Sequence, residues 1–167
     1  MSEQQKHFVI SRVFDAPRDV VWKMHTEAAH LKHWWGPKGF KLTHCQIDLR
    51  PGGLFHYRLE MPDGGEMWGK WVFREITPPE RLVFINSFSD AKGGTSRHSM
   101  KEVWPLEIVS TVTLAEESGK TRVTVDWIPQ NASASERKAF DEMHDSMRQG
   151  FTGTFDKLAA YLAQAKG

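Results

Sequence analysis

Three histidines near one another are the first residues whose types and spacing could do chemistry. His30 and His33 are three positions apart, which would place both imidazoles on one face of a helix, and His25 precedes them. Such a pair could hold a metal ion, but no acidic residue or further histidine is spaced to complete a recognised site. The sequence therefore predicts neither a metal site nor a cofactor.

An imidazole next to a thiol, at His44 and Cys45, could pair a base with a nucleophile. The surrounding stretch FKLTHCQID is typical of a strand, in which neighbouring side chains point to opposite faces. The two residues therefore cannot form a dyad, and we expect a buried, inert thiol. His56 falls on the polar face of the next strand and is expected to be exposed. No other catalytic set is evident, and the question whether the protein is an enzyme stays open.

Arg12 is a sharper candidate, because the period-two pattern of HFVISRVF places it on the apolar face of a strand. A buried guanidinium is costly unless it is paired. The favoured partner is a carboxylate of this chain, at Glu75 or Glu60. Two alternatives stay open: the carboxylate of an acidic ligand, which arginine holds in a bidentate fork, and a bulge that turns Arg12 to solvent.

Asn86 lies between Phe84 and Phe88 on the apolar face of RLVFINSF, where one amide among aromatic rings could orient a small molecule. A core amide with satisfied hydrogen bonds is an equal alternative. Aromatic side chains of other strands would form the walls of such a pocket, and methionines near the C-terminus would adapt to varied ligands or form plain core. The predicted ligand-binding residues are Arg12, Trp35, Phe55, Tyr57, Trp71, Phe84, Asn86, Phe88, Trp127, Met143, Met147 and Phe151.

Two adjacent tryptophans, Trp34 and Trp35, end a predicted short helix, because Gly36 suits the left-handed position after a helix and Pro37 cannot continue it. Neighbouring helical residues point about 100° apart, so the two rings cannot face the same part of the structure. One interpretation is that one ring packs into the core and the other faces a cavity or the C-terminal helix. Plain packing of both rings is the alternative, and it is the favoured one, because buried aromatic residues mostly form core.

The elements that would position these residues follow from hydrophobic periodicity. A strand at residues 7–14 is followed by two short helices. Between residues 40 and 128, alternating stretches separated by turn sequences such as RPGG and PDGG predict an antiparallel meander of six strands. Ser133 and Glu136 then have the spacing of a capping box, and the apolar residues that follow recur every three or four positions, which predicts one long helix.

This predicted helix is the only element large enough to cover a sheet that is apolar on one side. Where a curved sheet and the helix do not meet, an apolar cavity would remain between them. The sequence therefore predicts an α+β fold in which a curved antiparallel sheet wraps around a long C-terminal helix, with two short helices after the first strand.

Length and composition restrict the function. The 167 residues are expected to form one domain, 1–167, and 22 Lys and Arg against 21 Asp and Glu show no footprint for nucleic acid or an anionic membrane. No segment is typical of a membrane span or a signal peptide, so we expect a cytoplasmic protein without membrane insertion. Surplus tryptophans such as Trp68 and Trp104, if they lie outside the core, leave a homodimer open.

The sequence also resembles a known family. The segments that carry the resemblance are VFDAPRDVVWKMHTEAAHLKHWWGP, CQIDLRPGGLFHY, EITPPERLVF and FTGTFDKLAAYL. They are similar to signature segments of bacterial homologues of the activator of the heat-shock chaperone ATPase, in the START-like (SRPBCC) helix-grip superfamily. The resemblance extends from about residue 8 to residue 163. It implies one START-like domain with a hydrophobic cavity between the sheet and the C-terminal helix, and with the 89–105 loop near the cavity mouth.

From these observations we expect non-catalytic binding of a small hydrophobic or amphipathic molecule in the cavity. Two alternatives come from the superfamily, which hosts many unrelated functions. The first is a protein-partner role as a cofactor of a heat-shock chaperone. The second is a cyclase- or hydrolase-like enzyme, which would need a polar pair such as Arg12 with Glu75 or Asn86. A binder predicts an apolar cavity of about 300–1,000 Å³.

Overall fold

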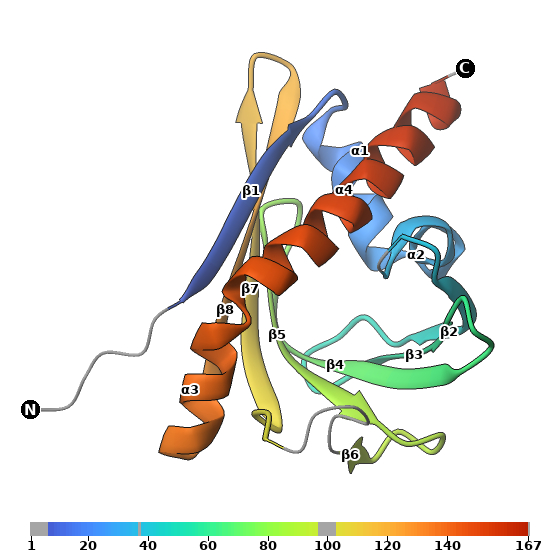
Figure 1. The fold of residues 1–167 in the computed structure, drawn as a ribbon. Coiled ribbons are helices and arrows are strands. Elements are labelled where there is room, and N and C mark those ends of the chain that lie inside the picture. Colours follow the sequence, from blue (N-terminus) through green and yellow to red (C-terminus); the bar gives the residue numbers. More distant parts are fainter. Residues whose placement is uncertain (1–6, 37, 97–102, 167) are drawn as a thin grey trace, which may run out of the picture.

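Strands from both halves of the chain form one sheet that curves around the C-terminal helix (Figure 1). The computed structural model describes residues 7–36, 38–96 and 103–166. In chain order the elements are β1 (Phe8–Phe14), α1 (Arg18–Thr26), α2 (Ala28–Trp34), β2 (Lys41–Ile47), β3 (Leu54–Glu60), β4 (Glu66–Thr77), β5 (Arg81–Ser89), β6 (Thr95–Ser96), β7 (Glu107–Glu117), β8 (Lys120–Gln130), α3 (Ala134–Glu142) and α4 (His144–Lys166).

The sheet confirms the predicted α+β helix-grip fold. Its strand order is β1-β8-β7-β5-β4-β3-β2, and neighbouring strands are antiparallel. The predicted glycine turns connect β2 to β3 and β3 to β4. The two-residue strand β6, which pairs with β5, adds to the six strands that the sequence predicts after the short helices. β1 pairs with β8 and lies at the opposite edge of the sheet from β2. α1 and α2 connect these two edge strands.

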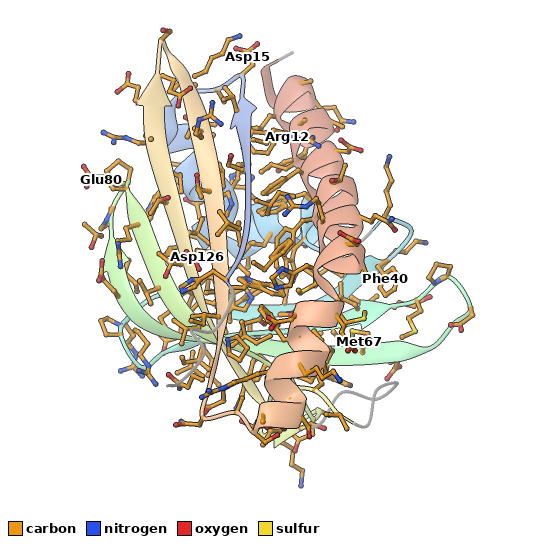
Figure 2. The ribbon with its side chains drawn as sticks, turned by 60° about the vertical axis from the view of Figure 1, so that its left-hand side comes forward. Arg12, Asp15, Phe40, Met67, Glu80 and Asp126 are labelled. Atoms are coloured by element: carbon orange, nitrogen blue, oxygen red, sulfur yellow. The ribbon has the colours of Figure 1, made fainter. Side chains whose placement is uncertain are left out.

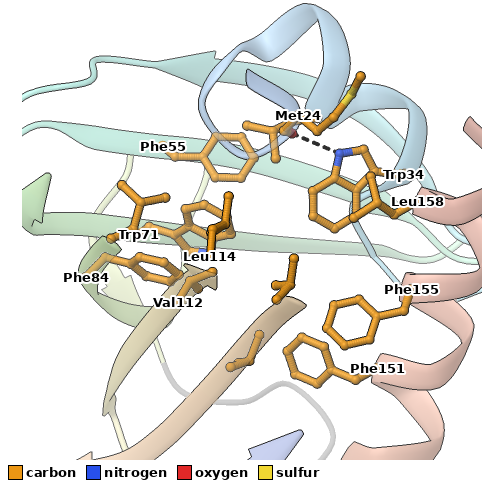
Figure 3. Packing of buried hydrophobic residues seen from close by; sticks show 14 of the residues in the cluster. Met24, Trp34, Phe55, Trp71, Phe84, Val112, Leu114, Phe151, Phe155 and Leu158 are labelled. Carbon is orange, nitrogen blue, oxygen red and sulfur yellow. Dashed lines mark hydrogen bonds between the residues drawn. The ribbon is translucent and has the colours of Figure 1, made fainter. Parts of the chain in front are cut away.

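Aromatic side chains fill the part of the core that lies beneath α1 and α2. Trp71 of β4 stacks on Phe84 of β5 with 4.1 Å between ring centroids, and it meets Phe55 of β3 edge to face at 4.6 Å (Figure 3). From the other side α4 contributes Phe155 and Leu158, which are 2% and 0% exposed. Tight packing of this kind leaves no room for a ligand here, so any larger space must lie elsewhere along α4.

The C-terminal region forms two helices, and the prediction of one long helix is wrong in this respect. The capping box is confirmed, because the Ser133 side chain accepts a hydrogen bond from the Glu136 backbone and the Glu136 carboxylate accepts one from the Ser133 backbone. α3 ends at Glu142, because the ψ of 5° at the following Met143 is not helical, and α4 continues in another direction (Figure 1). Phe140 is fully buried beside Trp104, so the apolar stripe stays on the core side although the backbone turns.

Among the described helices, none has the length and the apolar character that crossing a membrane requires.

Candidate functional site

A pocket of about 280 Å³ opens between the inner face of the sheet and the joint of α3 and α4. Its walls are mainly aromatic and aliphatic. The sheet supplies one wall, the two C-terminal helices supply the other, and the segment before β7 contributes Trp104 and Pro105. The position of these two residues agrees with the expectation that the 89–105 loop lies near the mouth, although residues 97–102 lie outside the described part of the chain.

The two adjacent tryptophans have separate roles, as one of the two interpretations of the sequence expects, and not the plain packing of both rings that was favoured. Trp34 is 1% exposed, and its indole N–H donates to the Met24 carbonyl at 2.9 Å (Figure 3). Trp35 lines the pocket and contacts Phe151 of α4. The two rings stand at 88° to each other, because α2 ends at Trp34 and Trp35 already has an extended backbone. The end of the helix therefore separates the rings, in addition to the angle between neighbouring helical positions.

Tyr57 reaches into the pocket because β4 has no side chain at the position opposite it. Its partner across the strands is Gly69, and a Cβ at Gly69 would lie 2.4 Å from the Tyr57 ring. A glycine inside a strand can mark a bulge or a site of close approach, and at Gly69 it is the ring of Tyr57 that approaches. Burial raises the pKa of the Tyr57 phenol to about 12, so the phenol is neutral at physiological pH.

The wall that α3 and α4 contribute is built around their joint. Met143 at the joint, and Met147 and Phe151 one and two turns further on, face the pocket together with Gly150. A Cβ at Gly150 would meet no atom within 4 Å, so this glycine leaves open space in the wall. Gly153 has different surroundings, because a Cβ there would reach van der Waals contact with Lys38 at 3.4 Å.

Most of the predicted ligand-binding residues meet at this pocket, although no bound molecule tests their role. Phe55, Trp71 and Phe84 do not line it, because they pack behind Trp35 in the core. Trp71 and Phe84 instead border a second cavity of about 10 Å³, which is barely the space of one water molecule. The predicted residues that line the main pocket are Trp35, Tyr57, Asn86, Phe88, Trp127, Met143, Met147 and Phe151.

Arg12 is placed away from the pocket, next to α4 (Figure 2). Its guanidinium donates to the Asp156 carboxylate at 2.8 Å and lies over the Phe155 ring, 5.7 Å from its centre. The predicted partners, Glu75 and Glu60, are wrong. Glu75 is paired with Arg81 at 3.0 Å, and Glu60 is exposed at the end of β3. The register on β1 was predicted correctly, but the partner comes from a helix that covers that strand, 144 positions away in the sequence.

The histidines of the N-terminal region contact aromatic side chains. His30 shares a hydrogen bond of 2.7 Å with the Tyr161 hydroxyl, and His33 stacks on the Tyr161 ring. His25 is fully buried and bonds the Val21 carbonyl. In the described part of the chain, no three His, Cys, Asp or Glu side chains gather as metal ligands would.

His56 is 8% exposed, and the prediction of an exposed imidazole is wrong. The loop after β5 folds over this face of β3, so that His56 Nε2 lies 3.1 Å from the Asp90 carbonyl, and the ring also stacks on Trp68. His44 shares this face, whereas Cys45 lies on the other face near Ala28, so the exclusion of a dyad is confirmed. Burial raises the pKa of the Cys45 thiol to about 11, which disfavours the reactive thiolate.

Several lining residues escaped the sequence reasoning. Leu59 and Met67 share their strand faces with Tyr57, so the period of two could have indicated them. Trp104 is 8% exposed and packs on Phe140, so it belongs to the core and does not supply the outer surface on which the possible homodimer was based. The lining residues that were not predicted are Gly36, Leu59, Met67, Ser87, Trp104, Pro105, Ile108, Ser146, Gly150 and Thr154.

Solved structures similar to this chain cover almost its whole length. A crystal structure of a protein from Mycobacterium smegmatis is 25% identical, covers 95% of this chain and 91% of that chain, and has a TM-score of 0.77. An X-ray structure of a protein from Nitrosomonas europaea is 26% identical, covers 99% of both chains and has a TM-score of 0.77. A crystal structure from Silicibacter pomeroyi, with 21% identity, coverage of 96% and 99% and a TM-score of 0.72, shows the shared fold alone.

A search of curated proteins finds no match. The sequence matches a family model over residues 15–163, which is most of its length. The chain therefore belongs to the family described as Activator of Hsp90 ATPase homolog 1-like protein.

Proposed function

We propose that this protein binds a small, largely apolar molecule in the pocket between the sheet and the α3–α4 joint. The observation that carries the proposal is an open, aromatic-lined space of about 280 Å³ directly beside a filled core. Trp71, Phe84 and Phe155 pack so closely that the cavity among them measures only about 10 Å³, whereas Trp35 and Met147 also border the much larger open space. The pocket is close to the lower end of the range of about 300–1,000 Å³ for ligand sites, which favours a small ligand.

The positions of the charged side chains favour binding without catalysis. The polar pair that an enzyme would need is not assembled, since Arg12 is held by Asp156 and Glu75 by Arg81. Among the described lining residues, the phenol of Tyr57 is the only ionisable side chain. An apolar pocket with a few neutral polar groups is typical of a site that selects a ligand by shape and hydrogen bonding.

Native mass spectrometry of the freshly purified protein tests the proposal. We expect a mass excess over the chain that disappears under denaturing conditions, together with binding of the neutral naphthalene dye prodan after the captured molecule has been extracted. Gly150→Leu should abolish both, because the new side chain would project into the open space at this position. It should not unfold the protein, since leucine is a better helix former than glycine.

Ala160→Leu is the matched control, because Ala160 lies on the exposed side of the same helix. It should retain both the mass excess and dye binding. A protein that carries no extra mass and does not bind prodan would contradict the proposal. The chaperone-partner role that the family description suggests would then be the function to test.

A further inference from the structure

Several neutral polar side chains line the pocket without a well-formed hydrogen bond to a described residue, and two of them project from the inner face of the sheet. These two are the phenol of Tyr57 on β3 and the carboxamide of Asn86 on β5. Buried and half-buried polar groups in folded proteins are nearly always hydrogen-bonded, so unpaired groups in a pocket indicate a ligand or a water molecule as partner. The positions of the hydroxyl and the carboxamide on the sheet indicate which ligand group they could bind.

Gly69 sets the direction of the phenol. A Cβ at Gly69 would come within 2.4 Å of both the ring and the hydroxyl oxygen of Tyr57, so the phenol lies over the backbone of β4. Its hydroxyl therefore extends from β3 toward β5. On β5, Asn86 pairs with Trp71, the next inward-facing residue of β4 after Gly69. The hydroxyl and the carboxamide thus come from adjacent rows of the same face of the sheet.

Trp35 favours the phenol as a hydrogen-bond donor. The indole N–H of Trp35 is a neighbour of the Tyr57 hydroxyl and lowers its pKa slightly against the larger effect of burial. The contact does not meet ordinary hydrogen-bond geometry, since the buried Trp35 Nε1 has no such partner in the described part of the chain. An N–H group near the phenolic oxygen still favours that oxygen as an acceptor, which leaves the O–H to donate into the pocket.

We propose that Tyr57 and Asn86 together bind the carbonyl oxygen of an uncharged, mainly apolar ligand, Tyr57 through its O–H and Asn86 through its amide N–H. This inference rests on the proposed function and names the ligand class. The described lining holds no Lys, Arg, His, Asp or Glu side chain, so a carboxylate or ammonium group would lose its hydration without a counter-charge. A ketone, ester or amide oxygen needs donors alone, and the two side chains supply them.

Three probes of similar size separate the contributions: 2-acetylnaphthalene, its hydrocarbon analogue 2-isopropylnaphthalene, and the anion 2-naphthoate. Their affinities would be measured by isothermal titration calorimetry on the full chain at neutral pH. We expect the ketone to bind about tenfold more tightly than the hydrocarbon, the size of one to two ordinary hydrogen bonds, and the carboxylate to bind weakest. Tyr57→Phe and Asn86→Leu should each reduce the preference for the ketone, and the double variant should remove it.

Tyr161→Phe is the matched control, since Tyr57 and Tyr161 are the two tyrosines of the chain and Tyr161 bonds His30 away from the pocket. It should keep the full preference for the ketone. Equal binding of ketone and hydrocarbon, or a preference that survives the double variant, would overturn the carbonyl site but leave the proposed function standing. If none of the three probes binds, both inferences fail. Circular dichroism checks the fold of each variant, and the two single substitutions provide independent readings.

Discussion

At the scale of single residues, His25 shows how burial in the core keeps an ionisable group in its neutral form. Its imidazole is fully buried, with one ring nitrogen hydrogen-bonded to the Val21 carbonyl and the ring in a T-shaped contact with Trp34. Burial lowers its pKa from 6.5 to about 4, and the hydrogen bond to Val21 offsets only part of that effect. His25 is therefore neutral in the folded protein at neutral pH.

This shift predicts a loss of stability in mild acid. Above pH 6.5 the imidazole is neutral in both states, and between pH 6.5 and about 4 the unfolded chain binds a proton that the folded chain does not. The free energy of unfolding should fall across this window by on the order of 3 kcal/mol and then level off with respect to this group. Urea unfolding at a series of pH values measures the fall.

His25→Gln should remove that part of the acid dependence, because glutamine can still bond Val21 and does not titrate. His33→Gln serves as the comparison, since the His33 ring is exposed at the surface of Tyr161. The assignment to His25 is wrong if wild type and His25→Gln lose stability in parallel between pH 6.5 and about 4.

Residue-scale prediction from sequence succeeded where the neighbours along the chain decide the outcome. The helix end just before Gly36 separated Trp34 from Trp35, and the opposite faces of a strand separated His44 from Cys45. It failed for His56, because the loop that buries this side chain is distant in the sequence: the contacting residue, Asp90, is 34 positions away. A period of two identifies the face of a strand, but it does not say what covers that face.

At the scale of elements, α4 combines two glycines with different surroundings. Gly150→Ala should raise the free energy of unfolding by about 1 kcal/mol, because the added methyl group enters open space and alanine is the better helix former. Gly153→Ala should raise it by a similar amount, since its Cβ would reach ordinary van der Waals contact with Lys38 at 3.4 Å. Urea unfolding of the two variants against wild type makes the comparison. A loss of stability in Gly153→Ala would contradict the fit of an added methyl group against Lys38.

The elements themselves were predictable to a large extent, because strand alternation and glycine turns are local signals. The break between α3 and α4 was not, since the apolar residues on both sides keep their spacing of three and four. One non-helical residue at Met143 changes the direction of the chain without changing that spacing. The change of direction accompanies a tertiary contact, the packing of Phe140 in the last turn of α3 against Trp104, which the local sequence does not indicate.

At the scale of the whole molecule, Arg12 and Asp156 connect one edge of the sheet to the helix that the sheet surrounds. Arg12 sits on β1, and the Asp156 carboxylate also lies 3.4 Å from Lys38, so α4 is tied to two separate segments. The Arg12 hydrogen bond is the main reason that the pKa of Asp156 is lowered. Because these side chains are partly exposed, water and salt screen the pair and its contribution to stability is small.

Arg12→Gln tests whether this contact belongs to the architecture or to ligand binding. We expect a slightly lower melting temperature that approaches the wild-type value at high salt, and unchanged affinity for 2-acetylnaphthalene, since Arg12 does not line the pocket. Differential scanning calorimetry and calorimetric titration give the two readings. A large loss of affinity would restore the acidic-ligand hypothesis for Arg12.

The location of the pocket could be foreseen only in outline. Strand registers put Tyr57, Asn86 and Trp127 on the inner face, and the helical stripe put Met147 opposite them. The sequence could not tell lining residues from those one layer deeper, such as Phe55 and Trp71, because both sets share the same faces and the same composition. That distinction depends on where α4 leaves the sheet, which is a property of the whole fold.

The contact of Trp35 with two other indoles has an optical consequence. Trp34 and Trp71 lie 5.9 Å and 5.0 Å from Trp35, with their rings nearly perpendicular to it. Chromophores this close absorb as a coupled set, and the sign and size of their circular dichroism depend on the angles between them. Trp35 is the member of the set that lines the pocket. A molecule that turns its ring on entering would therefore change the aromatic dichroism of the protein, even if the molecule itself absorbs no light.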